Sequence, residues 1–241
     1  AVLQSLRGTA VIDFPRKEHY TAEDLVAIIR ILRDPENGCP WDKVQTHSSI
    51  RMNFLEEAYE AVDALDANDA ELLCEELGDV MMQVAFHAEM EEETGTFTWQ
   101  DVCDGVCRKL VLRHPHIFGA APGMEGINDW DALKNKEKGR VTLAQDLQSV
   151  PKAMPALMRS AKLQKRAERC LGKQPADLSV LADAASRVGS SPDRAQAEQA
   201  LGELLFEAVR LARDAGLDPE QALQRCNERF LLQNTDSRKE L

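Results

Sequence analysis

The chain has 241 residues, of which 44% are hydrophobic, and this is enough to bury the core of one large or two smaller globular domains. Its formal net charge of −12 at pH 7 argues against a general DNA- or RNA-binding protein, because phosphate backbones are bound by clustered Lys and Arg. No apolar run reaches the roughly 18 residues of a membrane span. We therefore expect neither a membrane nor a nucleic acid polymer as partner.

The six cysteines contain no C-x-x-C pair, and disulfide frameworks are typical of shorter, more cysteine-dense secreted chains. Reduced thiols fit this pattern best, so we expect a cytoplasmic location. We expect residues 1–19 to form a flexible N-terminal segment.

Apolar residues recur at helical spacing along most of the remaining chain, and no convincing strand alternation occurs. The pattern predicts an all-α fold. In the first half we expect helices at about 21–34, 48–67, 69–93, 98–113 and 129–139. Their start and stop signals are capping-box pairs at Thr21/Asp24 and Thr98/Asp101, a cap at Asp69 and a terminating Gly95.

A second helical region follows Pro151 and Pro155, with helices expected near 156–170, 177–188, 193–215 and 218–233. The two halves share a faint similarity. EELGDVMMQVAFHAEM at 75–90 aligns with QALGELLFEAVRLARD at 199–214, and CRKLVLR at 107–113 aligns with NERFLLQ at 227–233. This favours duplication of a helical unit, although Leu-Gly-acid-aliphatic strings also recur by chance.

Two consecutive predicted helices carry paired carboxylates beside apolar stripes. Glu57 and Glu60 lie about 60° apart on a helical wheel, and Glu76 and Asp79 have the same spacing, with Gln83 between them. The expected stripes are Phe54, Ala58, Ala61 and Leu65 in the first helix, and Leu73, Leu77, Val80, Met81, Val84 and Ala88 in the second. Met82 and Phe86 lie opposite the second stripe, so that helix is apolar on two faces.

This placement puts four carboxylates beside buried surface, where they need a compensating charge. Two like charges about 5 Å apart repel by about 3 kcal/mol at an effective dielectric near 20. Hard oxygen donors without a His or Cys ligand set favour Mg²⁺, with Mn²⁺ as a substitute. The alternative is that both motifs are solvated helix faces, which is the usual explanation for either motif alone.

Ferritin-like di-iron proteins also use carboxylates on helices, but they require Glu-x-x-His pairs that these positions lack. His87 lies on the next turn, and we interpret it as a packing residue rather than a ligand.

Lys109 and Arg113 lie four residues apart and therefore on one helix face, close to the end of a predicted helix. Such a pair is commonly a solvated basic C-terminus that complements the helix dipole. Beside a carboxylate metal site it has a specific use, because a triphosphate needs positive partners for the oxygens that the metal does not reach.

In the loop before the first carboxylate helix, Trp41 and Asp42 offer a stacking surface and a hydrogen-bond acceptor for a base or sugar. A lone Trp, however, usually serves packing.

Taken in order, four segments of residues 20–140 resemble the MazG family of nucleoside triphosphate pyrophosphohydrolases: LRDPENGCPWDKVQTHSSIRMNFLEEAYEAVDAL, EELGDVMMQVAFHAEM, RKLVLRHPHIFG and NDWDALKNKEK. The resemblance implies an all-α catalytic domain at 20–145 in which Glu57, Glu60, Glu76 and Asp79 bind Mg²⁺. It implies that Lys109 and Arg113 bind phosphate, and that Glu56 binds a further metal or orients water. Trp41, Asp42 and Gln45, together with Trp130 and Lys134, match segments that contact nucleotide.

The second half, 150–241, resembles a second MazG-like domain that has lost its ligands. Ala200 and Glu203 stand where E-x-x-D is expected, and no E-E-x-x-E precedes them. Arg229 and Gln233 stand at the positions of Lys109 and Arg113. We expect this degenerate half to be catalytically silent and to serve structure, dimerisation or regulation.

The resemblance implies attack of a metal-activated water on the α-phosphorus of a nucleoside triphosphate, with release of a nucleoside monophosphate and pyrophosphate. Glu56 is the candidate general base. Two alternatives to this interpretation stay open. The first is a pyrophosphatase restricted to one nucleotide, such as dUTP, dCTP or phosphoribosyl-ATP. The second is a MazG-like scaffold that binds nucleotide without turnover.

The two-faced apolar helix also predicts an obligate homodimer, because an uncovered stripe of that size exposes on the order of several hundred Å². The alternative is a pseudo-dimeric monomer in which the second half of the same chain covers the stripe.

Overall fold

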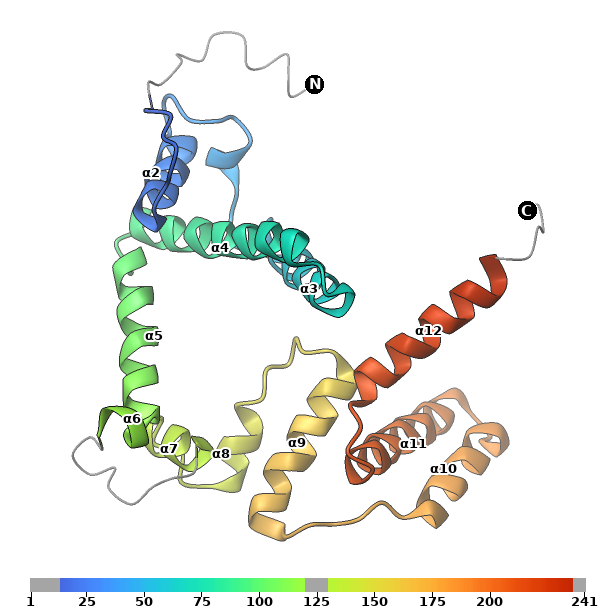
Figure 1. Ribbon diagram of the computed structural model, residues 1–241. Helices are drawn as coiled ribbons and strands as arrows, with labels where there is room; N and C mark the ends of the chain where they lie inside the picture. The colour runs from blue at the N-terminus through green and yellow to red at the C-terminus, as the bar shows by residue number, and fades with distance from the viewer. Residues whose placement is uncertain (1–13, 120–129, 236–241) are drawn as a thin grey trace. The chain divides into compact units, whose positions relative to one another are not determined.

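The computed structural model describes residues 14–119 and 130–235, and every regular element in these ranges is a helix (Figure 1). The expected all-α fold is confirmed. Most of the expected flexible segment 1–19 lies outside the described residues. No helix in the two described ranges is both long and apolar enough to cross a membrane. All six cysteines are free thiols.

The chain forms two compact units, one on each side of residues 120–129. The first contains α2 (Ala22–Arg33), the short 3-10 helix η1 (Asp42–Val44), α3 (Arg51–Ala67), α4 (Ala70–Glu93), α5 (Trp99–Arg113) and α6 (Pro115–Phe118). Sequence patterns predicted the four long helices to within three residues at each end. They did not predict η1 or α6, which are too short to show a periodicity.

The helix starts follow the predicted caps. Thr21 and Asp24 form a capping box at α2, and Thr98 and Asp101 form another at α5. Asp69 accepts hydrogen bonds from the backbone N–H groups of the first turn of α4. These side chains satisfy N–H groups that have no partner inside a helix, so they fix where each helix begins.

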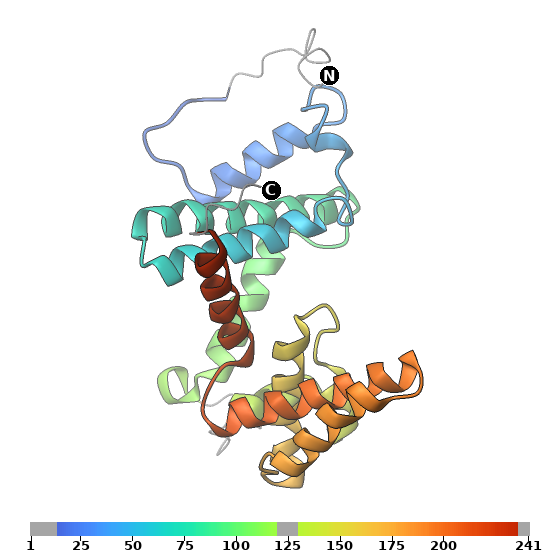
Figure 2. The ribbon, with the colours of Figure 1, turned by 90° about the vertical axis from the view of Figure 1, so that its right-hand side faces the viewer.

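Helices α3 and α4 form an antiparallel hairpin, seen side by side in Figures 1 and 2. Asn68 closes the turn in the left-handed conformation with φ of 54°, which Asn tolerates better than most residues. Ala61 and Ala64 are buried on α3, and their small side chains allow the two helices to approach closely. The hairpin thereby fixes the register between the carboxylates of the two helices.

Helix α2 packs across one face of α4, and the core of the unit lies between them. Ile29, Ile50, Ala85, Phe86 and Met90 form this core, with Met82 and Trp99 packed against it. Burial of such side chains contributes about 1.5–3 kcal/mol each for the larger ones. The face of α4 that carries Met82 and Phe86 is therefore the covered one.

The opposite stripe is covered only in part: Ala88 is buried, but other members are not. Leu65 of α3 and Leu77 and Met81 of α4 are exposed, with 57%, 54% and 42% of their surface accessible. The wheel showed that α4 has two apolar faces but not which one the chain itself would cover. Within the first unit, α2 is short and covers only one of them.

The second unit contains α7 (Trp130–Glu137), α8 (Leu143–Gln148), α9 (Ala156–Leu171), α10 (Leu178–Ser190), α11 (Arg194–Asp214) and α12 (Pro219–Thr235). The long helices match the predicted ranges closely, whereas α8 was not predicted. Helices α10 and α11 form a second antiparallel hairpin, and α9 packs on α11 (Figure 2). Helix α7 and the start of α8 belong to the predicted catalytic domain at 20–145, but in the structure both helices are part of the second unit. The predicted domain boundary at 145–150 stays a prediction.

The loop that follows α2 turns back tightly at Gly38. The N–H of Gly38 donates to the carbonyl of Asp34 at 2.9 Å, and the N–H of Cys39 donates to the carbonyl of Leu32 at 2.8 Å. A Cβ atom at Gly38 would overlap the backbone oxygens of Asp34 and Leu32. Only glycine fits this close approach, which directs the chain into η1.

We expect Gly38→Ala to lower the free energy of unfolding by about 1–3 kcal/mol, because backbone atoms rather than a flexible side chain must move. Urea denaturation followed by circular dichroism measures the change. Gly105→Ala is the matched control: it lies inside α5 with open space around its Cα, so alanine there should stabilise by about 0.5–1 kcal/mol. Equal effects of the two substitutions would contradict the claim that only glycine fits the close backbone approach at position 38.

Candidate functional site

The α3–α4 hairpin brings three of the predicted carboxylates together. Oxygen atoms of Glu57, Glu76 and Asp79 all lie within 4.8 Å of one another, and the three side chains are half-buried. Glu57 comes from α3, while Glu76 and Asp79 come from adjacent turns of α4. Glu60, one turn after Glu57, is more exposed and lies at the edge of this group.

The electrostatics of this carboxylate cluster, defined as Glu57, Glu76 and Asp79 with Glu60 at its edge, are unfavourable without a cation. Burial raises the pKa of Glu57 above its usual value, and the negative charges of Asp79 and Glu60 raise it further. Burial likewise raises the pKa of Glu76, with added repulsion from Glu60 and Asp79. Protons or a cation must offset this repulsion.

Gln83 adds a polar group to the base of the cluster. Its side chain is 7% exposed, and its Nε2 lies 3.5 Å from Oε1 of Glu57. Its Oε1 is buried and has no hydrogen-bond partner among the described residues. A buried carbonyl oxygen without a partner is costly, and beside carboxylates it is another hard oxygen that suits a hydrated divalent cation. The residues therefore fit Mg²⁺ or Mn²⁺ by their donor chemistry.

Arg33 of α2 anchors the loop before α3. The guanidinium of Arg33 donates to the carbonyls of Asp42 and Gln45 at 2.9 and 3.2 Å, and to both carboxylate oxygens of Glu93 at 2.6 and 2.9 Å. It also lies over the ring of Phe86, with 5.3 Å to the centroid. Arg33 therefore ties the loop that carries Trp41 and Asp42 to α2 and α4.

Gln45 is engaged within the loop. Its Nε2 donates to the carbonyl of Trp41 at 2.8 Å, and its Oε1 accepts from Oγ of Ser49 at 2.7 Å. Trp41 itself is 48% exposed, and Asp42 is half-buried at the start of η1. The exposed indole is available for stacking, whereas Gln45 holds the shape of the loop.

Comparison with known proteins shows the family of this chain. Residues 45–118 match the model of the MazG nucleotide pyrophosphohydrolase domain. The chain is 38% identical over 221 residues to the nucleoside triphosphate pyrophosphohydrolase of Escherichia coli (strain K12), a match that covers 86% of this chain and 82% of the relative. This chain belongs to the MazG family.

Two further relatives are also named nucleoside triphosphate pyrophosphohydrolases. The chain is 36% identical over 213 residues to the nucleoside triphosphate pyrophosphohydrolase/pyrophosphatase MazG of Thermotoga maritima, covering 87% of this chain and 82% of the relative. It is 35% identical over 166 residues to a nucleoside triphosphate pyrophosphohydrolase of Mycobacterium tuberculosis, covering 67% and 50%. The matched MazG domain contains the whole carboxylate cluster together with Lys109 and Arg113.

The two predicted phosphate-binding cations are not brought to the MazG carboxylates within the first unit. Helix α5 meets α4 at the C-terminal end of α4 and then runs away from the α3–α4 hairpin (Figure 1). From Asp79 to Glu93 at that end of α4 is about 21 Å at 1.5 Å per residue, and Lys109 lies about 15 Å along α5 from its start at Trp99. Lys109 is half-buried and Arg113 is buried.

The remaining predicted site residues lie at different places. Glu56 is exposed on α3, next to Glu57. Trp130 and Lys134 lie on α7, in the second unit, and Trp130 is 42% exposed. The contact of Trp130 and Lys134 with nucleotide stays a prediction.

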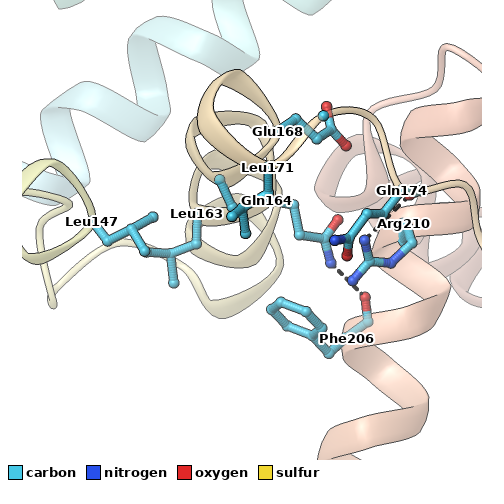
Figure 3. A pocket seen from close by; sticks show the side chains of 10 residues that line it. Leu147, Leu163, Gln164, Glu168, Leu171, Gln174, Phe206 and Arg210 are labelled. Carbon is cyan, nitrogen blue, oxygen red and sulfur yellow. Dashed lines mark hydrogen bonds between the residues drawn. The ribbon is translucent and has the colours of Figure 1, made fainter. Parts of the chain in front are cut away.

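The second unit has an apolar cavity of about 320 Å³, shown in Figure 3. Leu147, Leu163, Leu171 and Phe206 line it, with Gln164 and Arg210 at its edge. Both polar side chains donate to backbone carbonyls: Gln164 donates to that of Phe206 at 2.7 Å, and Arg210 donates to that of Gln174 at 3.2 Å. This cavity lacks the converging carboxylates of the first unit.

Sequence reasoning missed residues that position the loop. The sequence predicted Arg33 only as part of the helix at 21–34, because its partners in the loop and on α4 lie 9 to 60 residues away. His87 is half-buried and packs edge-on against Phe54, which agrees with its predicted packing role. Its Nδ1 also lies 2.7 Å from Nδ1 of His47, and His47 pairs with Glu91 at 2.9 Å. Burial, followed by the proximity of His47, lowers the pKa of His87.

Glu57→Gln should make the metal-free protein more stable at neutral pH and should remove its response to Mg²⁺. Because the pKa of Glu57 is raised in the folded state, ionisation of this carboxyl group opposes folding. Its contribution to stability is present below the unfolded pKa and is lost as pH rises through the folded pKa. The difference in Tm between the variant and the wild type, measured in EDTA, should therefore grow from about pH 4 to about pH 7.

The same thermal scans with Mg²⁺ in place of EDTA should raise the Tm of the wild type and not that of Glu57→Gln. Glu71→Gln, an exposed acid in the first turn of α4, is the matched control and should leave the Mg²⁺ response intact. An unchanged Mg²⁺ response in Glu57→Gln would remove Glu57 from the set of ligands.

Proposed function

We propose that this MazG protein is a divalent-cation-dependent pyrophosphohydrolase that converts a nucleoside triphosphate and water into a nucleoside monophosphate and pyrophosphate. One observation carries the proposal: the matched MazG domain holds Glu57, Glu76 and Asp79 with their oxygens within 4.8 Å of one another. The relatives named above are nucleoside triphosphate pyrophosphohydrolases. Mg²⁺ is the proposed cofactor and Mn²⁺ its substitute.

Glu57, Glu76 and Asp79, with Glu60 at the edge, would hold the cation. When bound, a divalent cation neutralises phosphate charge and makes a water molecule more acidic. The side chain of Gln83 packs below the cluster and orients Glu57 through its amide. Glu56 is exposed beside the cluster and is the proposed general base, which accepts a proton from the attacking water.

The loop anchored by Arg33 supplies recognition. Trp41 offers an exposed ring for stacking of a base, and Asp42 offers an acceptor for a base or sugar donor. Gln45 supports this loop through its two hydrogen bonds. Lys109 and Arg113 are proposed to bind phosphate oxygens, and Trp130 and Lys134 to close over the nucleotide. The free cysteines support a cytoplasmic location.

Residues 20–145 are the proposed catalytic domain, and residues 150–241 are the proposed silent one. Ala200 and Glu203 replace two carboxylates of the first half, and Ala200 offers no ligand at all. A role in structure, dimerisation or regulation remains for this half.

Asp79→Asn should lower turnover by about a hundredfold or more, because it keeps the size of the side chain but removes a charge that holds the cation. The assay follows pyrophosphate release across a panel of nucleoside triphosphates with Mg²⁺. Asp66→Asn, an exposed acid near the end of α3, is the control and should keep wild-type turnover. Release of orthophosphate and a diphosphate would show a different hydrolase, and binding without turnover would show a scaffold.

A homodimer would complete the site. Lys109 and the carboxylates are far apart in one first unit, and the hairpin leaves Leu65, Leu77 and Met81 exposed. Helix α5 presents Val106, Leu110 and Val111 as exposed apolar residues of its own. We propose that α5 of one copy packs against the exposed stripe of the α3–α4 hairpin of a second copy and brings Lys109 to its carboxylates.

Co-expression of Lys109→Ala and Asp79→Asn chains should then restore activity that neither variant has alone. If each site takes carboxylates from one chain and Lys109 from the other, a mixed dimer has one intact and one doubly defective site. With random pairing, recovery should approach about a quarter of wild-type turnover, since half of the dimers are mixed and each has half of its sites intact. Absence of recovery in a mixture shown by light scattering to be dimeric would place Lys109 and the carboxylates in the same chain.

A further inference from the structure

The α10–α11 hairpin of the second unit repeats the α3–α4 hairpin of the first. In both units two helices pack antiparallel, and a third helix packs across the second of them: α2 on α4, and α9 on α11. The alignment of 75–90 with 199–214 places Ala85 opposite Val209, and each is 1% exposed. Residues of α11 therefore correspond to residues of α4 with a constant offset.

A charge-swapped ion pair supports the same register. In the first unit, Arg30 of α2 makes a two-pronged pair with Glu89 of α4, at 3.0 and 3.2 Å. In the second unit, Glu168 of α9 makes a two-pronged pair with Arg213 of α11, at 2.8 and 2.6 Å. Arg213 is the residue that aligns with Glu89. The two units therefore use the same contact with opposite signs.

In this register the carboxylate cluster has a counterpart without its ligands. Ala200 stands at the position of Glu76 and is 1% exposed. Glu203 stands at the position of Asp79, and both of its oxygens are engaged. Its Oε2 accepts from Arg187 at 2.7 Å, and its Oε1 accepts from Gln199 at 2.9 Å.

Across the hairpin, Glu203 meets a cation, whereas Asp79 meets an acid. In the first unit an oxygen of Glu57 lies close to Asp79. In the second unit the α10 residue that pairs with Glu203 is Arg187, which also pairs with Asp183 on its own helix at 2.8 Å. One guanidinium thus lies between two carboxylates from two helices.

We propose that the guanidinium of Arg187 takes, in the second hairpin, the place that a divalent cation takes in the first, so that each chain holds metal in one hairpin only. The inference extends the proposed function, because it takes the first hairpin as the metal site. A guanidinium is always charged and has no open coordination position, so it neutralises carboxylates but cannot activate water.

The charges around the second hairpin agree with this exchange. Hydrogen bonds from Arg187 and then Gln199 lower the pKa of Glu203. The second hairpin therefore stabilises the ionised form of this carboxylate with its own side chains.

The first test is Mn²⁺ binding to the full-length protein, followed by the electron paramagnetic resonance signal of free Mn²⁺. Asp79→Asn should weaken Mn²⁺ binding at least tenfold, and Glu203→Gln should leave both affinity and stoichiometry as in the wild type. Loss of bound Mn²⁺ in Glu203→Gln would overturn the inference, since it would place metal in the second hairpin.

The second test restores an acid at position 187. In an Asp79→Asn background, Arg187→Glu adds a carboxylate to those of Asp183 and Glu203, which makes three. This double variant should bind Mn²⁺ at least threefold more tightly than Asp79→Asn alone. Arg194→Glu makes the same charge change at an exposed residue at the start of α11 and should not. Circular dichroism checks that each variant keeps its helices.

Equal Mn²⁺ binding by Arg187→Glu and Arg194→Glu would overturn the inference. Failure of the proposed function gives a different result, namely that Asp79→Asn binds Mn²⁺ as tightly as the wild type. The comparison between positions 187 and 194 remains decisive in that case, because both variants carry the same first hairpin.

Discussion

Repulsion among the carboxylates of the α3–α4 hairpin is the constraint on which the rest of the first unit depends. Two like charges about 5 Å apart cost about 3 kcal/mol at an effective dielectric near 20, a large share of the stability of an ordinary domain. The hairpin holds Glu57, Glu76 and Asp79 together nonetheless. It does so because buried Ala61 and Ala64 allow close helix packing and Asn68 closes the turn, so the backbone cannot relax to separate the charges.

A network of ion pairs at the C-terminal end of α4 holds α2 and the loop after it in place. Arg30 and Arg33 of α2 pair with three glutamates at the C-terminal end of α4, and Arg33 extends this network to the carbonyls of the loop. Arg33 is nearly buried, so its bonds to Glu93 and to the backbone are shielded from water. The ion pairs thus fix α2 and the loop after it on the C-terminal end of α4, while the carboxylate cluster lies nearer the other end.

Local signals in the sequence predicted the helices and the carboxylate motif, because caps and the 3.6-residue period act within a few residues. Thr21, Thr98 and Asp69 cap the helices as expected. The direction of α5 and the choice of the covered face of α4 were not predictable, since both depend on packing between distant segments. The role of Arg33 was missed for the same reason: its partners lie 9 to 60 residues away.

The two hairpins show how one helical unit can solve the same electrostatic problem in two ways. A tethered guanidinium neutralises Glu203 and Asp183 permanently, and it does so without a free cation. If stability alone mattered, the first hairpin would gain from the same exchange, because a metal-free carboxylate cluster opposes folding at neutral pH. The acids kept at Glu57, Glu76 and Asp79 therefore support the proposal that the first hairpin binds an exchangeable cation, which would offer open positions for water and phosphate.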